Sequence, residues 1–211
     1  MRWLKRMWKK LKRVLRHSNN SEPVQRELPL EQDGTPDVNE TEKPTNERKV
    51  SMLGVALIAS FEGFSSKPYL DSANVPTIGY GTIMYHNGKK VTMHDKPLTK
   101  KQSMDELWYE VNQKCKAVVV TTARYGLELE QHELDALCSF AYNVGVGPIV
   151  RRDSTVNRGI RNHDKALICK GMKLYCKAGG HRLRGLVKRR NIEVKVFKGE
   201  CVNDYKNCGQ L

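Results

Sequence analysis

The chain has 211 residues, of which 39% are hydrophobic, and its formal net charge is +14. This length is enough for one packed domain with extensions. No apolar run approaches the roughly 18 residues of a membrane-spanning helix, and no apolar stretch follows the basic start, which argues against a cleaved secretory signal. A basic chain favours an anionic partner, such as a cell-wall polymer, lipid headgroups or nucleic acid, and charge alone does not choose among them.

The positive charge is concentrated at the N-terminus, where residues 1–17 hold eight Lys/Arg and no acid. Their apolar residues recur at helical spacing: Trp3, Leu4, Met7, Trp8, Leu11, Val14 and Leu15. This pattern predicts an amphipathic helix that binds an anionic lipid surface, with Trp3 and Trp8 at the headgroup level. The alternatives are docking on the folded domain, a nucleic-acid tail and pairing with another protein.

Residues 18–50 hold four Lys/Arg and eight Asp/Glu and have few large apolar side chains. Such a segment cannot bury enough surface to fold alone, so we expect a flexible linker. We place a folded domain at residues 51–199, beginning near 48–51, and a C-terminal tail at residues 200–211.

The domain opens with a short apolar helix. Ser51 is suited to cap it, and Gly63 gives it a place to stop. Glu62 then lies at the C-terminal end of this helix between Phe61 and Phe64. Low dielectric and the negative end of the helix dipole both favour the neutral carboxyl group, which is the form that a general acid needs.

A second carboxylate, Asp71, follows in a polar loop between Pro68 and Pro76. There we expect it to stay ionised and to orient a water molecule. Two carboxyl groups in contrasting surroundings are the usual way to divide acid and base roles in glycoside hydrolysis. Thr77 then opens the run Thr77-Ile78-Gly79-Tyr80-Gly81, whose glycines let a ligand approach the backbone closely.

The remaining elements follow from local signals. Asn87-Gly88 predicts a hairpin turn within residues 82–91, which should form a small antiparallel sheet with residues 69–81. Thr99 and Gln102 form a capping box for a helix to about Ala123. Further helices are expected over residues 129–145, after Ser154, after Asp164 until the break at Ala178-Gly179-Gly180, and over residues 185–197.

The chain has six cysteines: Cys115, Cys138, Cys169, Cys176, Cys201 and Cys208. Their spacing fits no usual zinc site, so we expect no metal. Cys138 lies on an apolar helix and is predicted to be a buried thiol. Cys201 and Cys208 have the spacing to close a loop as a disulfide, although synthesis in the cytoplasm favours reduced cysteines.

The run from Glu62 through Asp71 and Thr77 to Ile78-Gly79-Tyr80-Gly81 resembles the signature of the phage-type lysozymes, glycoside hydrolase family 24. Two further segments are similar to that family: the helix that contains Leu134-Asp135-Ala136-Leu137-Cys138-Ser139-Phe140, and the closing Gly-Leu-x-x-Arg-Arg-x-x-Glu pattern from Gly185. Leu134 departs from the family, which frequently has an aromatic there. The resemblance covers residues 51–199 and leaves out the two ends.

The resemblance implies an α+β, lysozyme-like fold, with a small sheet-bearing lobe, a larger helical lobe and a cleft between them. It implies a muramidase that cleaves the N-acetylmuramic acid–N-acetylglucosamine bond of peptidoglycan without a cofactor. Glu62 would be the general acid, Asp71 would position or activate a water molecule, and Thr77 would help hold it. The residues Gly79, Tyr80 and Gly81 would lie along the substrate cleft, and the family suggests an inverting course.

Arg189 is expected to point inward and to need a carboxylate partner; the family resemblance implies that this partner is Glu62, with Arg190 as the alternative donor and Glu193 as the alternative partner. We expect a monomeric bacteriophage endolysin that is made in the host cytoplasm, reaches the wall after a holin or similar agent opens the membrane, and has no nucleic-acid partner. A virion-borne lysozyme used at entry and a non-catalytic cationic binding protein are the alternatives.

Overall fold

The computed structural model describes residues 48–201 and Tyr205. The basic segment 1–17, most of the expected linker and most of the expected tail lie outside the described residues. The helices are α2 (Met52–Phe61), α3 (Lys100–Arg124), α4 (Gln131–Val144), α5 (Gly147–Val150), α6 (Thr155–Arg161), α7 (Lys165–Leu174) and α8 (Arg184–Phe197). The strands are β1 (Ser65–Leu70), β2 (Pro76–Gly79), β3 (Lys177–Ala178) and β4 (His181–Arg182).

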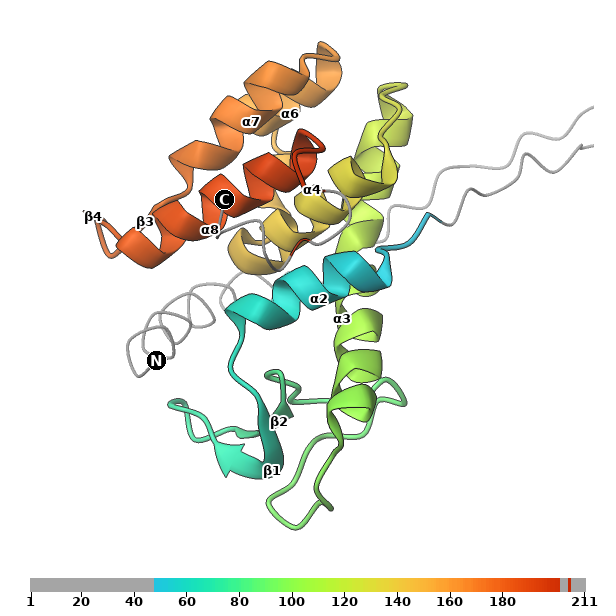
Figure 1. Cartoon of the computed structure of the whole chain (residues 1–211), viewed down its shortest axis with the longest axis vertical. Helices are drawn as coiled ribbons and strands as arrows, with labels where there is room; N and C mark the ends of the chain where they lie inside the picture. The colour runs from blue at the N-terminus through green and yellow to red at the C-terminus, as the bar shows by residue number, and fades with distance from the viewer. Residues whose placement is uncertain (1–47, 202–204, 206–211) are drawn as a thin grey trace, which may run out of the picture.

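These elements form a small lobe and a larger helical lobe that share one long helix. Figure 1 shows β1 and β2 at one end of the molecule and α6, α7 and α8 at the other, with α3 running between them. The chain leaves the C-terminal end of α2 and enters the small lobe at β1. The junction that follows α2 is therefore where the two lobes meet.

The sheet of the small lobe is not the one that the sequence predicts, because residues 65–70 pair with residues 76–79 and the segment 82–91 forms no strand. Strands β1 and β2 pair antiparallel, with Tyr69 opposite Thr77. The predicted turn at Gly88 forms, but its flanking residues contribute only isolated bridges, such as Met84 with Lys90. One reason is the backbone at the end of β2, which leaves the extended conformation at Gly79 and again at Gly81, both with positive φ.

The helix starts predicted from capping residues are confirmed. Ser51 accepts a hydrogen bond from the amide of Gly54, the capping box at Thr99 is complete, and Asp164 caps α7. Helix α7 ends at Leu174, before the predicted glycine break. The two glycines of that break instead form the turn of the short hairpin β3–β4.

Helix α4 is the centre of the larger lobe. Every residue from Glu133 to Asn143 is buried, because α2, α3 and α8 all pack against it. The apolar stripe of α3 contacts the same core through Leu107, Val111 and Val118. Trp108, which is partly buried, packs against the same core and donates its indole N–H to the carbonyl of Val50 at 3.2 Å.

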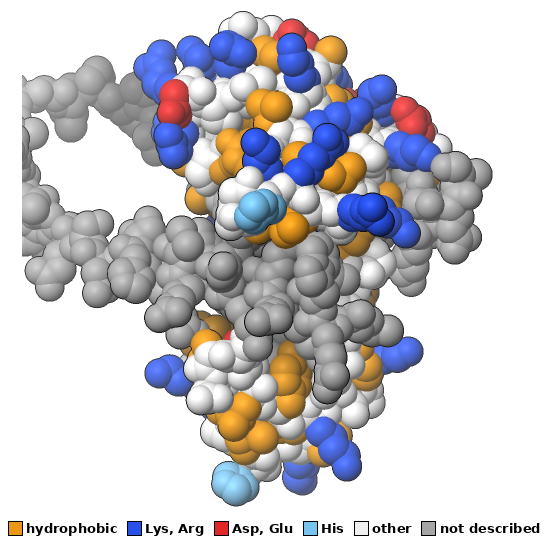
Figure 2. All heavy atoms as spheres, turned by 90° about the vertical axis from the view of Figure 1, so that its left-hand side faces the viewer, with side chains coloured by type: hydrophobic (Ala, Val, Ile, Leu, Met, Phe, Trp, Pro, Cys, Tyr) orange, Lys and Arg blue, Asp and Glu red, His pale blue; other side chains and the backbone are white. Residues whose placement is uncertain are grey.

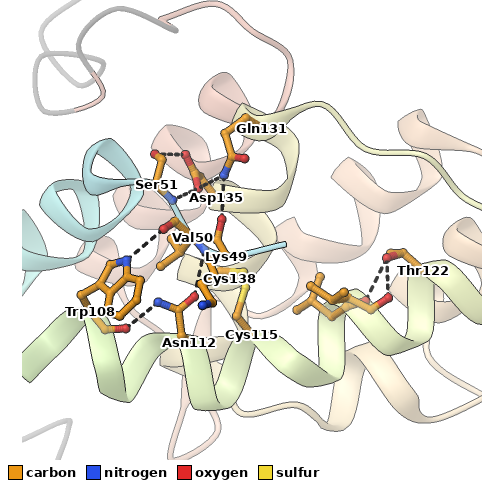
Figure 3. The surroundings of a disulfide bond; sticks show 12 residues. Lys49, Val50, Ser51, Trp108, Asn112, Cys115, Thr122, Gln131, Asp135 and Cys138 are labelled. Carbon is orange, nitrogen blue, oxygen red and sulfur yellow. Dashed lines mark hydrogen bonds between the residues drawn. A yellow bond between two sulfur atoms is a disulfide. The ribbon is translucent and has the colours of Figure 1, made fainter. Parts of the chain in front are cut away.

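A disulfide joins α3 to α4 through Cys115 and Cys138 (Figure 3), so the prediction of a free thiol at Cys138 is wrong. The two cysteines are 23 residues apart in the chain, and only the packing of α3 against α4 brings them together. Cys201 is also disulfide-bonded, whereas Cys169 and Cys176 are free, buried thiols. The expectation of a reduced Cys201 is therefore wrong as well.

Above this disulfide, the chain that enters α2 is fixed between α3 and α4 (Figure 3). The amide of Val50 donates to Asn112 on α3 at 2.9 Å. Asp135 on α4 accepts from the amide of Ser51 at 2.8 Å and from its hydroxyl at 2.5 Å. Gln131 holds the carbonyl of Lys49 at 3.0 Å. We call residues 49–51 with these partners the entry clamp, and it fixes where α2 begins.

Candidate active site

Helix α2 delivers Glu62 to the junction of the lobes. The helix ends at Phe61, and Glu62 is its C-cap with an extended backbone, whose amide donates to the carbonyl of Ala59 at 3.2 Å. Its side chain is only 10% exposed. The carboxyl group is thus largely shielded from bulk water, as the position of Glu62 beside Phe61 predicts.

Arg189 of α8 reaches Glu62 from the larger lobe. One of its guanidinium nitrogens lies 3.2 Å from the carboxylate of Glu62, and the guanidinium carbon lies 4.5 Å from the centre of the Phe61 ring. Arg189 is 5% exposed. The predicted contact between Arg189 and Glu62 is therefore present, and a buried cation faces the candidate acid.

The same guanidinium is shared with a second carboxylate. The Nε atom of Arg189 donates to Glu193 at 3.0 Å, and Glu193 is completely buried. Glu193 also accepts from the hydroxyl of Ser139 at 2.8 Å. The alternative partner considered from the sequence is thus a partner in addition to Glu62, and Arg189 divides its charge between the two carboxylates.

Arg190 turns away from Glu62 and completes this network. Its Nε lies 2.8 Å from Glu193, and it donates to the side chain of Asn143 at 2.8 Å. Burial lowers the pKa of Arg190 to about 10, although the charge of Glu193 opposes this effect. The idea that Arg190 is the donor to Glu62 is therefore wrong. Sequence reasoning missed Ser139 and Asn143, although their four-residue spacing on α4 places them on one face.

Tyr142 of α4 is a further neighbour of Glu62 that the sequence did not indicate. Burial and then the negative charges of Glu110 and Glu62 raise the pKa of Tyr142 well above its ordinary value. Its ring lies 4.2 Å from the ammonium of Lys114, which pairs with Glu110 at 2.8 Å. Tyr142 of α4, with Glu110 and Lys114 of α3, thus lies near Glu62 on its larger-lobe side.

Asp71 lies in the turn between β1 and β2 and organises that turn. Its carboxylate accepts from the amides of Ala73 at 2.7 Å and Val75 at 3.1 Å. Tyr69 connects it to Glu62, because burial and then the charges of Asp71 and Glu62 raise the pKa of Tyr69. The two carboxylates of the sequence motif are therefore both within electrostatic reach of one side chain.

Thr77 is the most enclosed of the motif residues, with 2% of its surface exposed. Its hydroxyl donates to the carbonyl of Val75 at 2.9 Å, so its oxygen keeps lone pairs with which to accept a further hydrogen bond. The predicted need for glycine is clearest at Gly79, where φ is +63° and a side-chain carbon would lie 2.9 Å from the Ser103 hydroxyl.

Gly81 also has a positive φ, of +106°. Between the two glycines, the ring of Tyr80 packs 5.2 Å from the ring of Phe64, centre to centre. Phe64 itself is 37% exposed and follows Glu62 by two residues. The Gly79–Gly81 turn therefore packs Tyr80 against an aromatic residue that follows the candidate acid closely in the chain.

Within residues 48–201, no group of three or more His, Cys, Asp or Glu side chains is arranged to hold a metal ion. In the same part of the chain, no helix is long and apolar enough to cross a membrane.

The chain is similar to several phage proteins. Residues 59–193 match the phage lysozyme family. An endolysin of Bacillus phage PZA is 35% identical over 71% of this chain, which spans 55% of that protein. A SAR-endolysin of Haemophilus phage HP1 is 30% identical over 74% of this chain and 86% of that protein.

The structure is likewise similar to an endolysin from Escherichia coli O157:H7 phage FAHEc1, with a TM-score of 0.60 and 31% identity over 71% of this chain and 93% of that one. The expected lysozyme-like α+β fold is thereby confirmed. The chain belongs to the phage lysozyme family and is a lysozyme-type glycoside hydrolase.

Proposed function

We propose that this enzyme cleaves the N-acetylmuramic acid–N-acetylglucosamine bond of peptidoglycan with Glu62 as the general acid. The observation that supports this role most directly is the placement of Glu62, 10% exposed at the junction of the lobes and 3.2 Å from Arg189. Because Arg189 is also bound to Glu193, its positive charge is shared between two carboxylates, Glu193 and Glu62. Arg189 thereby orients the side chain of the candidate acid.

Asp71 is the proposed partner of Glu62 in the reaction. In an inverting course it activates a water molecule on the face of the sugar opposite the leaving group, which requires roughly 6.5–9.5 Å between the two carboxyl groups. One oxygen of the Asp71 carboxylate accepts hydrogen bonds from the amides of Ala73 and Val75. These bonds fix the direction of the carboxylate. Thr77 helps hold the water by accepting a hydrogen bond from it.

The substrate is proposed to lie along the turn Gly79–Gly81. Both glycines leave the backbone bare, and the Tyr80 and Phe64 rings offer apolar surface of the kind on which a sugar packs. Arg189 and Arg190 are supporting residues: the first orients Glu62, and the second holds Glu193 in place. None of these roles requires a metal or an organic cofactor.

The biological role that fits this activity is that of an endolysin that lyses the host cell at the end of infection. We propose that a monomer, made in the host cytoplasm, reaches the wall through a membrane opened by a holin or similar agent. Residues 1–17 then bind anionic lipid through their eight basic residues, with Trp3 and Trp8 as anchors. Residues 18–50 leave the enzyme free to reach the wall.

Glu62→Gln tests the chemical assignment because it keeps the shape of the side chain and removes the proton that it donates. We expect the release of soluble muropeptides from purified peptidoglycan to fall by about 10²–10⁴-fold, while the variant stays folded. Glu128→Gln is the matched control, since Glu128 is exposed. Hydrolysis by Glu62→Gln at the rate of this control would show that another group donates the proton.

A further inference from the structure

The C-terminal helical unit, residues 165–198, is rich in positively charged side chains. These residues hold eleven Lys/Arg and a single acid, Glu193. The acid is completely buried and is paired with Arg189 and Arg190, which are buried too. The other nine cations of this unit are exposed or half-buried, and two of them, Lys165 and Lys198, pair with Glu133 and Glu200 from outside it.

Four of these cations border a groove on the outer side of α8. Arg184, Lys188 and Lys195 recur on one side of the helix, and Arg182 joins them from β4. The groove has a volume of about 670 Å³. It lies on the side of α8 opposite Glu193, so it is separate from the active site.

The groove is amphipathic. Val187 and Ile192 supply apolar lining between the cations, and Asn191 adds a neutral polar group. In the space-filling view of this side of the molecule, Lys and Arg side chains gather on the larger lobe with hydrophobic side chains between them (Figure 2). A ligand that fits has an anionic head and an apolar body.

We propose that this groove is a binding site for the phosphate headgroup of an anionic lipid, which docks the catalytic domain itself on a membrane surface. A lipid matches both properties of the groove: its phosphate meets Arg182, Arg184 and Lys188, and its glycerol and first methylenes contact Val187 and Ile192. A single-stranded nucleic acid is usually bound with aromatic rings on which its bases stack, and the described residues that line the groove include none. The described residues that line the groove are separate from those assigned to glycan cleavage.

The test is a triple substitution, Arg182→Gln, Arg184→Gln and Lys188→Gln, at three exposed positions. Its matched control is Lys101→Gln, Lys116→Gln and Arg124→Gln on α3, also exposed and equal in charge removed. Both sets are made in the full chain and in a full chain whose eight basic residues in 1–17 are Gln. The second background removes the contribution expected from the N-terminal segment.

Partitioning is measured by co-sedimentation with phosphatidylglycerol–phosphatidylcholine vesicles, with pure phosphatidylcholine vesicles as reference. In the second background we expect the groove variant to lose about fivefold in partition coefficient for each charge removed, since each cation near an anionic surface contributes about 1 kcal/mol. The control should lose markedly less. Hydrolysis of purified peptidoglycan by the groove variant should equal that of the wild type, which separates this site from the catalytic assignment.

Equal losses for the two triple variants would overturn the proposal, because the binding would then follow net charge alone. Inorganic phosphate at millimolar concentration should displace vesicles more from the wild type than from the groove variant. Equal displacement from the two proteins would also overturn the proposal. A groove-dependent affinity for duplex DNA or for purified peptidoglycan that exceeds the affinity for vesicles would assign the groove to another partner and refute a lipid site.

Discussion

Glu193 is the residue on which the buried network beside the active site depends. Its carboxylate has three partners: Arg189 Nε at 3.0 Å, Arg190 Nε at 2.8 Å and the Ser139 hydroxyl at 2.8 Å. Glu193→Gln keeps the size of the side chain and removes its charge. Arg189 still faces Glu62 after the change, but Arg190, which is 1% exposed, loses the carboxylate that pairs with it and keeps neutral partners such as Asn143 and the Phe140 ring.

Breaking one partner of a buried ion pair costs about 3–5 kcal/mol, because a buried charge is left without compensation. For a domain of this size, 1 kcal/mol shifts the unfolding midpoint by about 2–4 °C. We therefore expect Glu193→Gln to lower the midpoint by about 6–20 °C. The same substitution at exposed Glu128 should change stability by no more than about 0.5 kcal/mol.

The assay is thermal unfolding followed by circular dichroism, with Arg190→Met added to complete a double-mutant cycle. If Glu193 stabilises the fold by compensating Arg190, the double variant loses less than the sum of the two single variants. Additive losses, or a Glu193→Gln midpoint equal to that of Glu128→Gln, would refute this account of the network.

Two further predictions concern the disulfide and the small lobe. Replacing both Cys115 and Cys138 by Ser should lower the free energy of unfolding by about 3 kcal/mol, because the two cysteines are 23 residues apart and a disulfide over such a loop restricts the unfolded chain. Urea unfolding measures this loss, and equal stability of the variant and the wild type would contradict it. The pKa of Asp95 is lowered, chiefly by the hydrogen bond from the Thr92 hydroxyl. The ionised Asp95 side chain therefore stabilises the fold fully above about pH 3.9, the pKa of a free Asp, and this stabilisation is lost as pH falls through the lowered pKa. The stability difference between wild type and Asp95→Asn in urea should therefore shrink from pH 7 to pH 2, and a constant difference would contradict this reasoning.

The features that the sequence predicts well depend on local chemistry. Ser51, Thr99 and Asp164 each satisfy amide groups at the start of their own helices, so the signal lies within four residues of the feature. The inward direction of Arg189 follows from its position on the apolar face of α8, and family resemblance supplies Glu62 as its partner. Local periodicity thus locates the elements, and the motif locates the candidate acid.

The features that the sequence does not predict depend on how helices pack. Nothing in the spacing of Cys115 and Cys138 distinguishes a disulfide from two thiols, because the pairing is decided by the contact of α3 with α4. The same packing decides between the two arginines. Arg189 and Arg190 are neighbours with identical chemistry, and only the direction in which each leaves α8 assigns the first to Glu62 and the second to Asn143.

The position of Glu62 is set from both ends of α2. A helix of ten residues is too short to be stable by itself in water, so tertiary contacts must fix it. At its start, the entry clamp holds Ser51 on Asp135, and a side-chain carbon at Gly54 would lie 2.7 Å from the Asp135 carboxyl carbon, so the helix approaches α4 as closely as glycine permits. At its end, Arg189 binds Glu62 and contacts the ring of Phe61. Both anchors rest on α4 and α8, which places the candidate acid on the larger lobe, while Asp71 belongs to the small one. The relative position of the two carboxyl groups therefore depends on how the lobes are held together, and α3, which runs through both and is joined to α4 by the disulfide, is the element that holds them.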